Sequence, residues 1–392
     1  MVQKPELIAF SHYKMGGVQN FYYNLLRILS QTGEFDIVWI YDDSDDMENA
    51  RLAQPYGIGQ EIIFKSDLKE DKTVYDRFKR LSKYVSDRPG LIVTNFYLEL
   101  SALHVHRRKN KTIYFVCHDE QYLRQAKEYE FLIDVFIAHN PQFYKAMRAL
   151  FPHREKDIHY LPYGITLRNL PVKPVDPDKL RIIYAARHVE HKGVRDLPEI
   201  IATVEAVSPH VEWMILGDGP MTPYLKEQFS QRPNIRFYNP PTNEEVVELM
   251  AQNDVYILPS YLDGLPVAML EAMSAGCVPV LYRFNEGIVD ILKPEEGFIV
   301  PMGDKAGFAD KIIQLYNNRT LLQQMKVAGM NKVREEYDIN KCVKGYKDLF
   351  LRYKEFKRPV QRKFIAYGGW MEHPVIPSFV RNGFRSIKKL VS

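Results

Sequence analysis

Cysteine is scarce in this chain of 392 residues. Cys117, Cys277 and Cys342 are odd in number, scattered, and set in or beside apolar runs, which excludes a disulfide framework and a zinc cluster. Long hydrophobic runs are also absent, because no stretch reaches the roughly 18 apolar residues that a membrane span requires. No internal repeat or low-complexity tract is present. These absences predict a cytoplasmic protein that is neither secreted nor membrane-spanning.

A large net charge is lacking as well, but the charge is unevenly distributed. The total is +4 at pH 7, yet from Arg352 to Ser392 ten basic residues stand against two acidic ones. The remainder holds 43 basic and 47 acidic residues. The slightly acidic body argues against a nucleic-acid-binding core, whereas the basic tail leaves an anionic surface open as a partner.

The chain does contain enough apolar residues for extensive cores, at 46% of its length. Short β-rich runs alternate with helical stretches in both halves, a rhythm typical of parallel α/β sheets. A proline-rich segment, residues 169–179, separates the halves and predicts a linker. The expected organisation is a Rossmann-like domain over 1–168, a linker over 169–180, a second Rossmann-like domain over 181–345, and a helix with a basic tail over 346–392.

Ligands of such sheets bind where strands deliver their carboxyl ends to loops. The first strand is followed by Gly16 and Gly17 at the start of a helix. Backbone N–H groups there can approach a phosphate or sugar closely. An ordinary strand-to-helix turn explains the two glycines about equally well.

Two loops in the second half carry related signals. Arg187 and Lys192 lie five residues apart on a loop that ends in glycine, so they can bracket a diphosphate, although a solvated basic turn is the alternative. After the strand over 211–216, Gly217-Asp218-Gly219 predicts a tight turn that serves the structure first and a base pocket second.

The most specific segment is residues 254–280. A strand ends at Pro259, Pro266 is expected in the first turn of a helix, and a glycine closes that helix. Free N–H groups from Gly264 and Leu265 to Val267 can hold a phosphate. Asp263 can accept hydrogen bonds from sugar hydroxyls, and Glu271 from a ribose diol, because a carboxylate among apolar helix neighbours needs a partner.

With these segments in order, residues 5–350 resemble the retaining glycosyltransferases of family four, glycosyl transferases group 1. The resemblance implies an α/β GT-B fold: two Rossmann-like domains with parallel sheets facing an interdomain cleft, and a C-terminal helix that crosses back to the first domain. It also implies a nucleotide-sugar donor, each part of which is bound by different residues. The resemblance assigns the diphosphate to Arg187 and Lys192, the ribose to Glu271, the sugar hydroxyls to Asp263, the phosphate to Gly17, and the sugar near its reacting carbon to His118.

The implied activity is a metal-independent retaining hexosyltransferase without a cofactor. It would use a nucleotide-diphosphate sugar, a UDP-sugar in the first instance, and a glycan or lipid-linked glycan acceptor, in surface polysaccharide or glycolipid synthesis. The first domain would bind the acceptor. The family's first glutamate is Asp263 here, one methylene shorter, so the identity of the sugar cannot be carried over.

Several alternatives stay open. A catalytically silent GT-B scaffold that binds nucleotide is favoured only by the aspartate at 263, and a phosphorylase of the same fold would need a cofactor lysine site that the sequence does not reveal. The acidic segment from Asp42 to Asp46 contains an Asp-x-Asp pattern that could bind a metal, but a solvated acidic loop is the better interpretation. For His118 the alternative is a structural role, as a packed histidine at the end of a strand.

The tail adds a last expectation. Residues 374–392 place apolar side chains on one helical stripe with basic residues among the polar positions. This pattern fits a helix that lies on an anionic membrane surface, at the inner membrane face, or one that packs against the first domain.

Overall fold

The computed structural model describes residues 4–12, 17–43, 55–65, 71, 73–106, 110–118, 120–171, 173–359, 361, 363–365 and 367. Contacts between Cα atoms divide the chain into two units. The first unit contains the residues up to His139, then Phe143–Leu161 and the residues from Val343 onward. The second contains Asn140–Gln142 and Pro162–Cys342.

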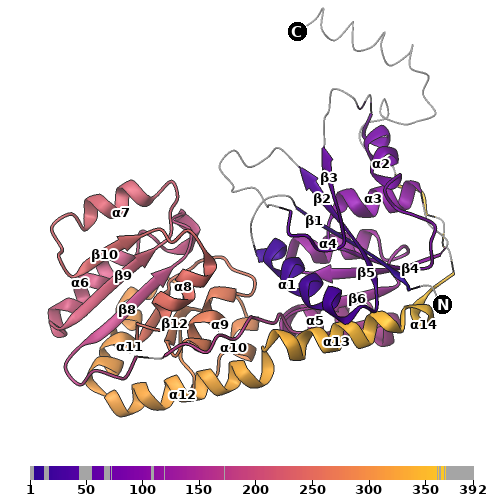
Figure 1. Cartoon of the computed structure of the whole chain (residues 1–392). Helices are drawn as coiled ribbons and strands as arrows, with labels where there is room; N and C mark the ends of the chain where they lie inside the picture. The colour runs from indigo at the N-terminus through magenta and orange to yellow at the C-terminus, as the bar shows by residue number, and fades with distance from the viewer. Residues whose placement is uncertain are drawn as a thin grey trace, which may run out of the picture. The chain divides into compact units, whose positions relative to one another are not determined.

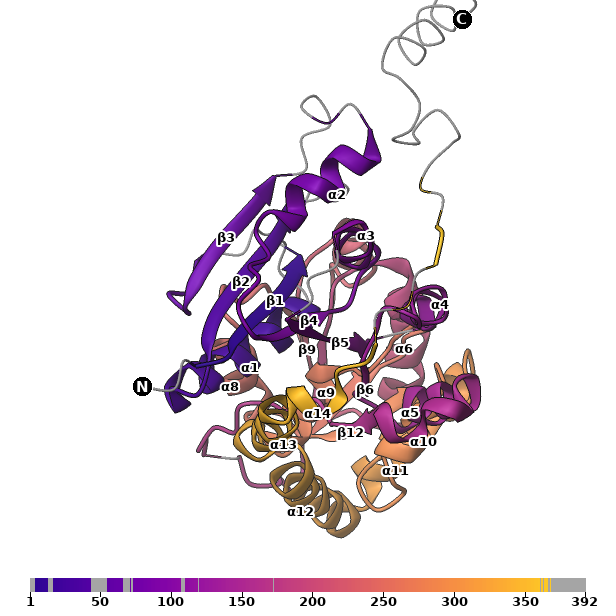
Figure 2. The same ribbon diagram turned by 90° about the vertical axis from the view of Figure 1, so that its right-hand side faces the viewer.

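The first unit is built on a seven-stranded sheet in the order β3-β2-β1-β4-β5-β6-β7, and every neighbouring pair is parallel. Figure 2 shows β3, β2 and β1 side by side in that order. The strands are β1 Glu6–His12, β2 Asp36–Asp43, β3 Gln60–Lys65, β4 Gly90–Thr94, β5 Lys111–Cys117, β6 Val135–Ala138 and β7 Ile158–Tyr160. Helices follow most strands, namely α1 Gly17–Thr32, α2 Val74–Ser82, α3 Tyr97–Val105, α4 Glu120–Glu128, α5 Pro141–Leu150 and the 3-10 helix η1 Pro152–Asp157.

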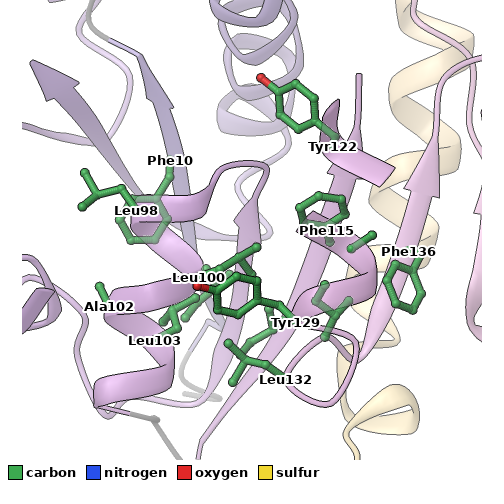
Figure 3. Packing of buried hydrophobic residues seen from close by; sticks show 14 of the residues in the cluster. Phe10, Leu98, Leu100, Ala102, Leu103, Phe115, Tyr122, Tyr129, Leu132 and Phe136 are labelled. Atoms are coloured by element: carbon green, nitrogen blue, oxygen red, sulfur yellow. The ribbon is translucent and has the colours of Figure 1, made fainter. Parts of the chain in front are cut away.

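Burial explains why these segments form strands and helices. Every residue of β4, β5 and β6 is buried, as expected for parallel strands covered on both faces. Helix α1 buries one stripe of side chains, Phe21, Tyr22, Leu25, Leu26 and Leu29, which is the stripe that its helical spacing predicts. Figure 3 shows part of another core cluster of the first unit, with Leu98 and Leu103 of α3 on one side, Phe115 and Phe136 on the other, and Tyr129 between them.

The second unit is built on a six-stranded parallel sheet in the order β10-β9-β8-β11-β12-β13. Its strands are β8 Leu180–Ala185, β9 Val211–Leu216, β10 Ile235–Tyr238, β11 Val255–Leu258, β12 Val278–Tyr282 and β13 Phe298–Val300. Its helices are η2 Glu190–Lys192, α6 Leu197–Val207, α7 Thr222–Gln228, α8 Asn243–Met250, α9 Val267–Ser274, α10 Gly287–Ile291, α11 Lys305–Asn317 and α12 Arg319–Glu336. Together the two sheets confirm the expected α/β fold of two parallel-sheet domains (Figure 1).

A buried charge cluster fixes the middle of the second sheet. Asp254, at 0% exposure, accepts hydrogen bonds from the Arg181 guanidinium of β8 (2.9 Å from Nε) and from Lys326 Nζ of α12 (2.9 Å). A buried carboxylate requires such partners, since an unpaired charge in the interior is strongly destabilising. The cluster therefore ties β8, the start of β11 and α12 together.

The helix α13 Ile339–Leu351 begins in the second unit and ends in the first, as the expected crossing helix does. It is followed by α14 Tyr353–Phe356. Both helices dock on the first sheet: Tyr114 donates a hydrogen bond to the Leu349 carbonyl of α13 (3.1 Å), and Thr112 donates one to the Tyr353 carbonyl of α14 (2.8 Å). Cys117, Cys277 and Cys342 are all buried free thiols, as expected.

Candidate active site

The order of the second sheet reverses between β8 and β11. These two strands are neighbours, and the chain proceeds outward from them in opposite directions, through β9 and β10 on one side and β12 and β13 on the other. Such a switch point is where parallel α/β sheets bind ligands, because the loops at the carboxyl ends of the two strands diverge there. The loops concerned, residues 186–193 and 259–266, are the two that carry the predicted cations and the first carboxylate.

An ion pair joins these two loops. Lys192 Nζ lies 2.5 Å from Asp263 Oδ2, and the two side chains are 15% and 17% exposed. The structure therefore brings together two site residues to which the sequence assigned separate ligand groups, the diphosphate and the sugar. A ligand that binds either group therefore competes with its partner for it.

Gly193 allows the two loops to approach this closely. Its φ of +73° lies in the left-handed region, and a Cβ built there would fall 1.8 Å from the Pro259 carbonyl oxygen. The neighbouring His191 carbonyl accepts hydrogen bonds from the Tyr261 N–H (2.8 Å) and the Ser260 hydroxyl (3.1 Å). The glycine after Lys192 is thus required by packing of the loops, which the sequence alone did not reveal.

Arg187 is the second predicted cation of this loop, and its side chain is not paired with an acidic residue among those that the structure describes. It is exposed, and its side chain makes no ion pair or hydrogen bond among the described residues, although its carbonyl accepts one from the Val189 N–H (2.9 Å). Burial and then the positive charges of Lys192 and Arg187 lower the pKa of His191, while Asp263 acts in the opposite direction. Arg187, Lys192 and Asp263 therefore act on one region of space around His191, as the spacing of the two cations predicts.

The turn after β9 supports the same loop from its other side. Gly217 has a φ of +116°, and a Cβ there would lie 2.1 Å from the Ala186 carbonyl oxygen. His188 N–H donates to the Asp218 carbonyl (2.9 Å). Asp218 itself accepts hydrogen bonds from the Thr222 hydroxyl (2.6 Å) and the Gly219 N–H (2.8 Å). Gly217 lets the chain pass directly beside the residue that precedes Arg187.

The segment after β11 differs from the sequence expectation in two details. Helix α9 begins at Val267, and Pro266 precedes it at the cap position with an extended ψ of 94°. The Gly264 N–H is engaged by Asp263 Oδ1 at 3.1 Å. Asn285, which the sequence did not single out, donates to the carbonyls of Asp263 (2.9 Å) and Gly264 (3.1 Å) and so holds the backbone of this loop.

Glu271 lies in α9 between Leu270 and Ala272, both fully buried. Burial raises the pKa of its carboxyl to about 7, with a hydrogen bond from Asn243 and the charge of Arg168 acting in the opposite direction. Asn243 Nδ2 donates to Oε1 at 2.8 Å. Glu271 is itself only partly buried, so a carboxyl of this kind remains accessible to a ligand.

The remaining described candidates belong to the first unit. Gly17 begins α1, and a Cβ there would meet nothing within 4 Å, so packing of the described residues does not require glycine at that position. His118 directly follows β5, and its ring centroid lies 5.5 Å from that of Phe21 and 4.7 Å from that of His139. His118 is thus packed among rings at the carboxyl edge of the sheet, which is compatible with both interpretations of it.

His139 is a residue that the sequence analysis missed. It directly follows β6, the neighbour of β5, so a histidine at the end of a strand-like run was the available signal. Its Nδ1 lies 2.9 Å from the Tyr346 hydroxyl of α13, and burial lowers its pKa to about 4. His139 is therefore neutral at pH 7, and it connects the strand end to α13 within the first unit.

Some candidates lie outside the described residues. These are Gly16, residues 44–46 of the acidic segment, and the tail over 374–392, while Asp42 and Asp43 are the last residues of β2. Among the described residues, no group of three or more histidine, cysteine, aspartate or glutamate side chains is arranged to hold a metal ion. The described part of the chain also contains no helix with the length and apolar character needed to cross a membrane.

Comparison with known proteins assigns the family. Residues 168–332 match the family of glycosyl transferases group 1. This segment of the chain is similar to glycosyl transferases group 1. The matched residues contain the whole switch-point arrangement, from Arg187 through Asp263 to Glu271.

Individual relatives agree with this assignment. Over 43% of its length, the chain is 25% identical to the amylovoran biosynthesis glycosyltransferase AmsK of Erwinia amylovora, of which the match covers 44%. Over 36% of its length it is 26% identical to the UDP-Gal:alpha-D-GlcNAc-diphosphoundecaprenol alpha-1,3-galactosyltransferase of Escherichia coli, of which the match covers 37%. The match thus spans less than half the length of either relative.

Among solved structures, the chain is similar to sucrose-phosphate synthase from Thermosynechococcus elongatus. The TM-score is 0.72, the sequence identity is 17%, and the match covers 91% of this chain and all of the other. At this identity the likeness shows the fold. It confirms the GT-B architecture that the sequence resemblance implies.

Proposed function

We propose that this protein transfers a hexose from a UDP-sugar to a glycan or lipid-linked glycan acceptor, with retention of configuration at the reacting carbon, in surface polysaccharide or glycolipid synthesis. The arrangement at the switch point of the second sheet carries the proposal. There, an exposed unpaired arginine, a lysine–aspartate ion pair and a glutamate of raised pKa occupy one family-defining segment.

Each group has a chemical task in this reaction. Arg187 can bind the diphosphate by its guanidinium fork, and Lys192 can join it once its ammonium leaves Asp263. Asp263 is then free to accept hydrogen bonds from the hydroxyls of the donor sugar, and Glu271 can accept those of the ribose. The two cations stabilise the charge that develops on the leaving diphosphate, which is the type of preorganised electrostatics that contributes most to such steps.

The names of the relatives support the choice of substrates. The Escherichia coli relative is named for a UDP-galactose donor and a diphosphoundecaprenol-linked acceptor, and AmsK for the biosynthesis of a polysaccharide. We propose the same classes of donor and acceptor here. Gly16, Gly17, Gly217, Gly264 and Leu265 are proposed as further donor contacts, and His118 as a contact to the sugar.

Release of nucleoside diphosphate from a panel of UDP-glucose, UDP-galactose, UDP-N-acetylglucosamine and GDP-mannose tests the proposal without knowledge of the acceptor. Proton NMR of the first sugar released distinguishes retention from inversion before the anomers equilibrate. Arg187→Ala should reduce turnover by about tenfold to a hundredfold, because charge-assisted hydrogen bonds contribute about 1.5–3 kcal/mol each. Arg195→Ala removes an exposed arginine from the same segment, paired with Glu190, and is the matched control. Binding of UDP without any turnover would favour the silent scaffold.

The two cations also lead to a proposal about metals. Because Arg187 and Lys192 can neutralise the leaving diphosphate, we propose that catalysis needs no metal ion and no cofactor. Activity should persist in EDTA. If EDTA abolishes the activity and manganese restores it, a metal ion rather than the two cations neutralises the leaving diphosphate.

The basic tail supports a proposal about location, from its sequence alone. We propose that residues 374–392 bind anionic membrane surfaces, where each basic residue contributes on the order of 1 kcal/mol. The full chain should sediment with vesicles of phosphatidylglycerol at low salt and not with phosphatidylcholine. Charge reversal at Lys388 and Lys389 should abolish sedimentation, whereas reversal at Lys344 and Lys347 in α13 should not. A wild type that ignores anionic vesicles contradicts the proposal.

A further inference from the structure

A side chain outside the proposed donor-binding residues forms a hydrogen bond with one of their carboxylates. Asn243, the first residue of α8, donates from Nδ2 to Glu271 Oε1 at 2.8 Å. Among the described residues, no other side chain or backbone group forms a hydrogen bond with the Glu271 carboxyl. The contact joins two helices whose sequence positions are 28 residues apart.

We propose that Asn243 is a positioning residue that holds the Glu271 carboxylate in the orientation needed to bind the ribose diol of a nucleoside diphosphate. The inference rests on the proposed function, since it concerns the same donor nucleotide. It adds a residue to which neither the sequence pattern nor the comparisons assign a role.

The chemistry of the diol explains why such a residue is needed. A ribose presents two neighbouring O–H donors, and an ionised carboxylate offers about four lone-pair positions on its two oxygens. One amide N–H from Asn243 occupies one of these positions and leaves Oε2 and part of Oε1 for the diol. A protonated carboxyl would itself present an O–H and would lose that part of its accepting capacity.

The surroundings of Glu271 make the ionised form difficult to maintain. Burial raises the pKa of the carboxyl to about 7, and the charge of Glu244 adds to the rise. The hydrogen bond from Asn243 and the positive charge of Arg168 oppose it. Arg168 and Glu244 are themselves paired, with Nη2 2.7 Å from Oε1, so their effects on Glu271 partly cancel. The hydroxyl of Tyr256 is the other titratable group that interacts with Glu271, and it is buried and neutral.

The start of α8 holds Asn243 in place independently of its side chain. Thr242 caps the helix by accepting a hydrogen bond from the Glu245 N–H at 3.2 Å. Loss of the Asn243 amide therefore removes the contact to Glu271 while the helix retains its cap. Thr242→Ala is the opposite change, because it removes the cap of α8 and leaves the Asn243 side-chain amide in place.

The test is calorimetric binding of UDP to the full chain between pH 5.5 and 9, for the wild type, Asn243→Ala, Asn243→Asp and Thr242→Ala. If one charge-assisted hydrogen bond moves the Glu271 pKa from about 7 to about 8, the ionised fraction at pH 7 falls from about one half to about one tenth. Asn243→Ala should then bind UDP more weakly than the wild type at every pH, because the carboxylate is no longer held in place, and the loss should be roughly fivefold greater at pH 7 than at pH 9. Asn243→Asp should bind more weakly still, because it places a like charge beside Glu271.

Thr242→Ala should lower the melting temperature without moving the pH dependence, which separates positioning from helix stability. A direct readout uses carbon-13 glutamate carboxyl signals, with Glu271→Gln to assign the resonance, and expects a higher titration midpoint in Asn243→Ala. If the UDP affinity of Asn243→Ala depends on pH in the same way as that of the wild type, this inference is wrong while the proposed function stands. A wild type that binds no UDP at any pH overturns the proposed function, and this inference with it.

Discussion

Lys192 Nζ lies 2.5 Å from Asp263 Oδ2, across two loops whose residues are 71 positions apart in the sequence. The cation proposed for the diphosphate is thus neutralised by the carboxylate proposed for the sugar. A nucleotide-sugar that binds both groups competes with this ion pair at both ends. The donor would thereby be recognised as a whole, since UDP alone leaves the aspartate without a partner.

The pair predicts non-additive effects on nucleotide binding. Asp263→Asn should bind UDP about two- to tenfold more tightly, because Lys192 no longer has to leave a carboxylate, while turnover of the UDP-sugar falls by at least about tenfold. Lys192→Met should weaken UDP binding by about tenfold or more. In the Lys192→Met background the gain from Asp263→Asn should disappear, and calorimetry of the four proteins measures this. A gain that persists without Lys192 would show that Asp263 acts through its charge alone.

The raised pKa of Glu271 predicts a stability cost at alkaline pH. The folded protein retains a proton that the unfolded chain releases between pH 4.5 and about 7, so the contribution of Glu271 to stability falls as pH rises through this window. Glu271→Gln should therefore equal the wild type at pH 4.5 and exceed its free energy of unfolding by about 1–3 kcal/mol at pH 8. Urea denaturation at both pH values measures the difference. The exposed α8 substitution Glu248→Gln should show no such change between the two.

The position of Gly193 predicts that even alanine there destabilises the folded protein strongly. Alanine there combines a left-handed φ with a Cβ 1.8 Å from the Pro259 carbonyl oxygen, so Gly193→Ala should lower the free energy of unfolding by about 3 kcal/mol or more. Gly303 is the matched control, because its φ is +80° and its nearest contact is 3.7 Å away, at the Tyr261 hydroxyl. Gly303→Ala should cost only about 1–2 kcal/mol. Equal losses in thermal or urea unfolding would mean that the loop moves away from Pro259 at little cost.

His139 predicts part of the acid sensitivity of the first unit. Its pKa is about 4 in the folded protein and about 6.5 when unfolded, so its stabilising contribution is complete above pH 6.5 and is lost progressively as pH falls toward 4. His139→Gln should be less stable than the wild type at pH 7, because it loses its fitted contact to Tyr346. Between pH 7 and pH 4.5, the free energy of unfolding of His139→Gln should fall by about 2–3 kcal/mol less than that of the wild type. Parallel acid slopes for the two proteins in urea denaturation would exclude His139 as the source.

The sequence by itself determined the alternation of strands and helices, because apolar periodicity reflects which face of each element is buried. The buried stripe of α1, the start of α8 at Asn243 and the fully buried run of β5 all follow from local pattern. Short motifs also located the loops that matter, since glycines, prolines and charges cluster at the carboxyl ends of strands. Arg187, Lys192, Asp263 and Glu271 were found in this way.

Only the tertiary structure decided which of these residues meet. The Lys192–Asp263 pair exists because β8 lies beside β11, and local sequence pattern does not specify the order of strands in a parallel sheet. The same reason hid Asn243 and Asn285, which are ordinary polar residues in sequence and acquire their roles through contacts to Glu271 and to the Asp263 loop. The raised pKa of Glu271 is likewise a tertiary property, because it depends on burial by neighbouring helices rather than on the residue or its neighbours in sequence.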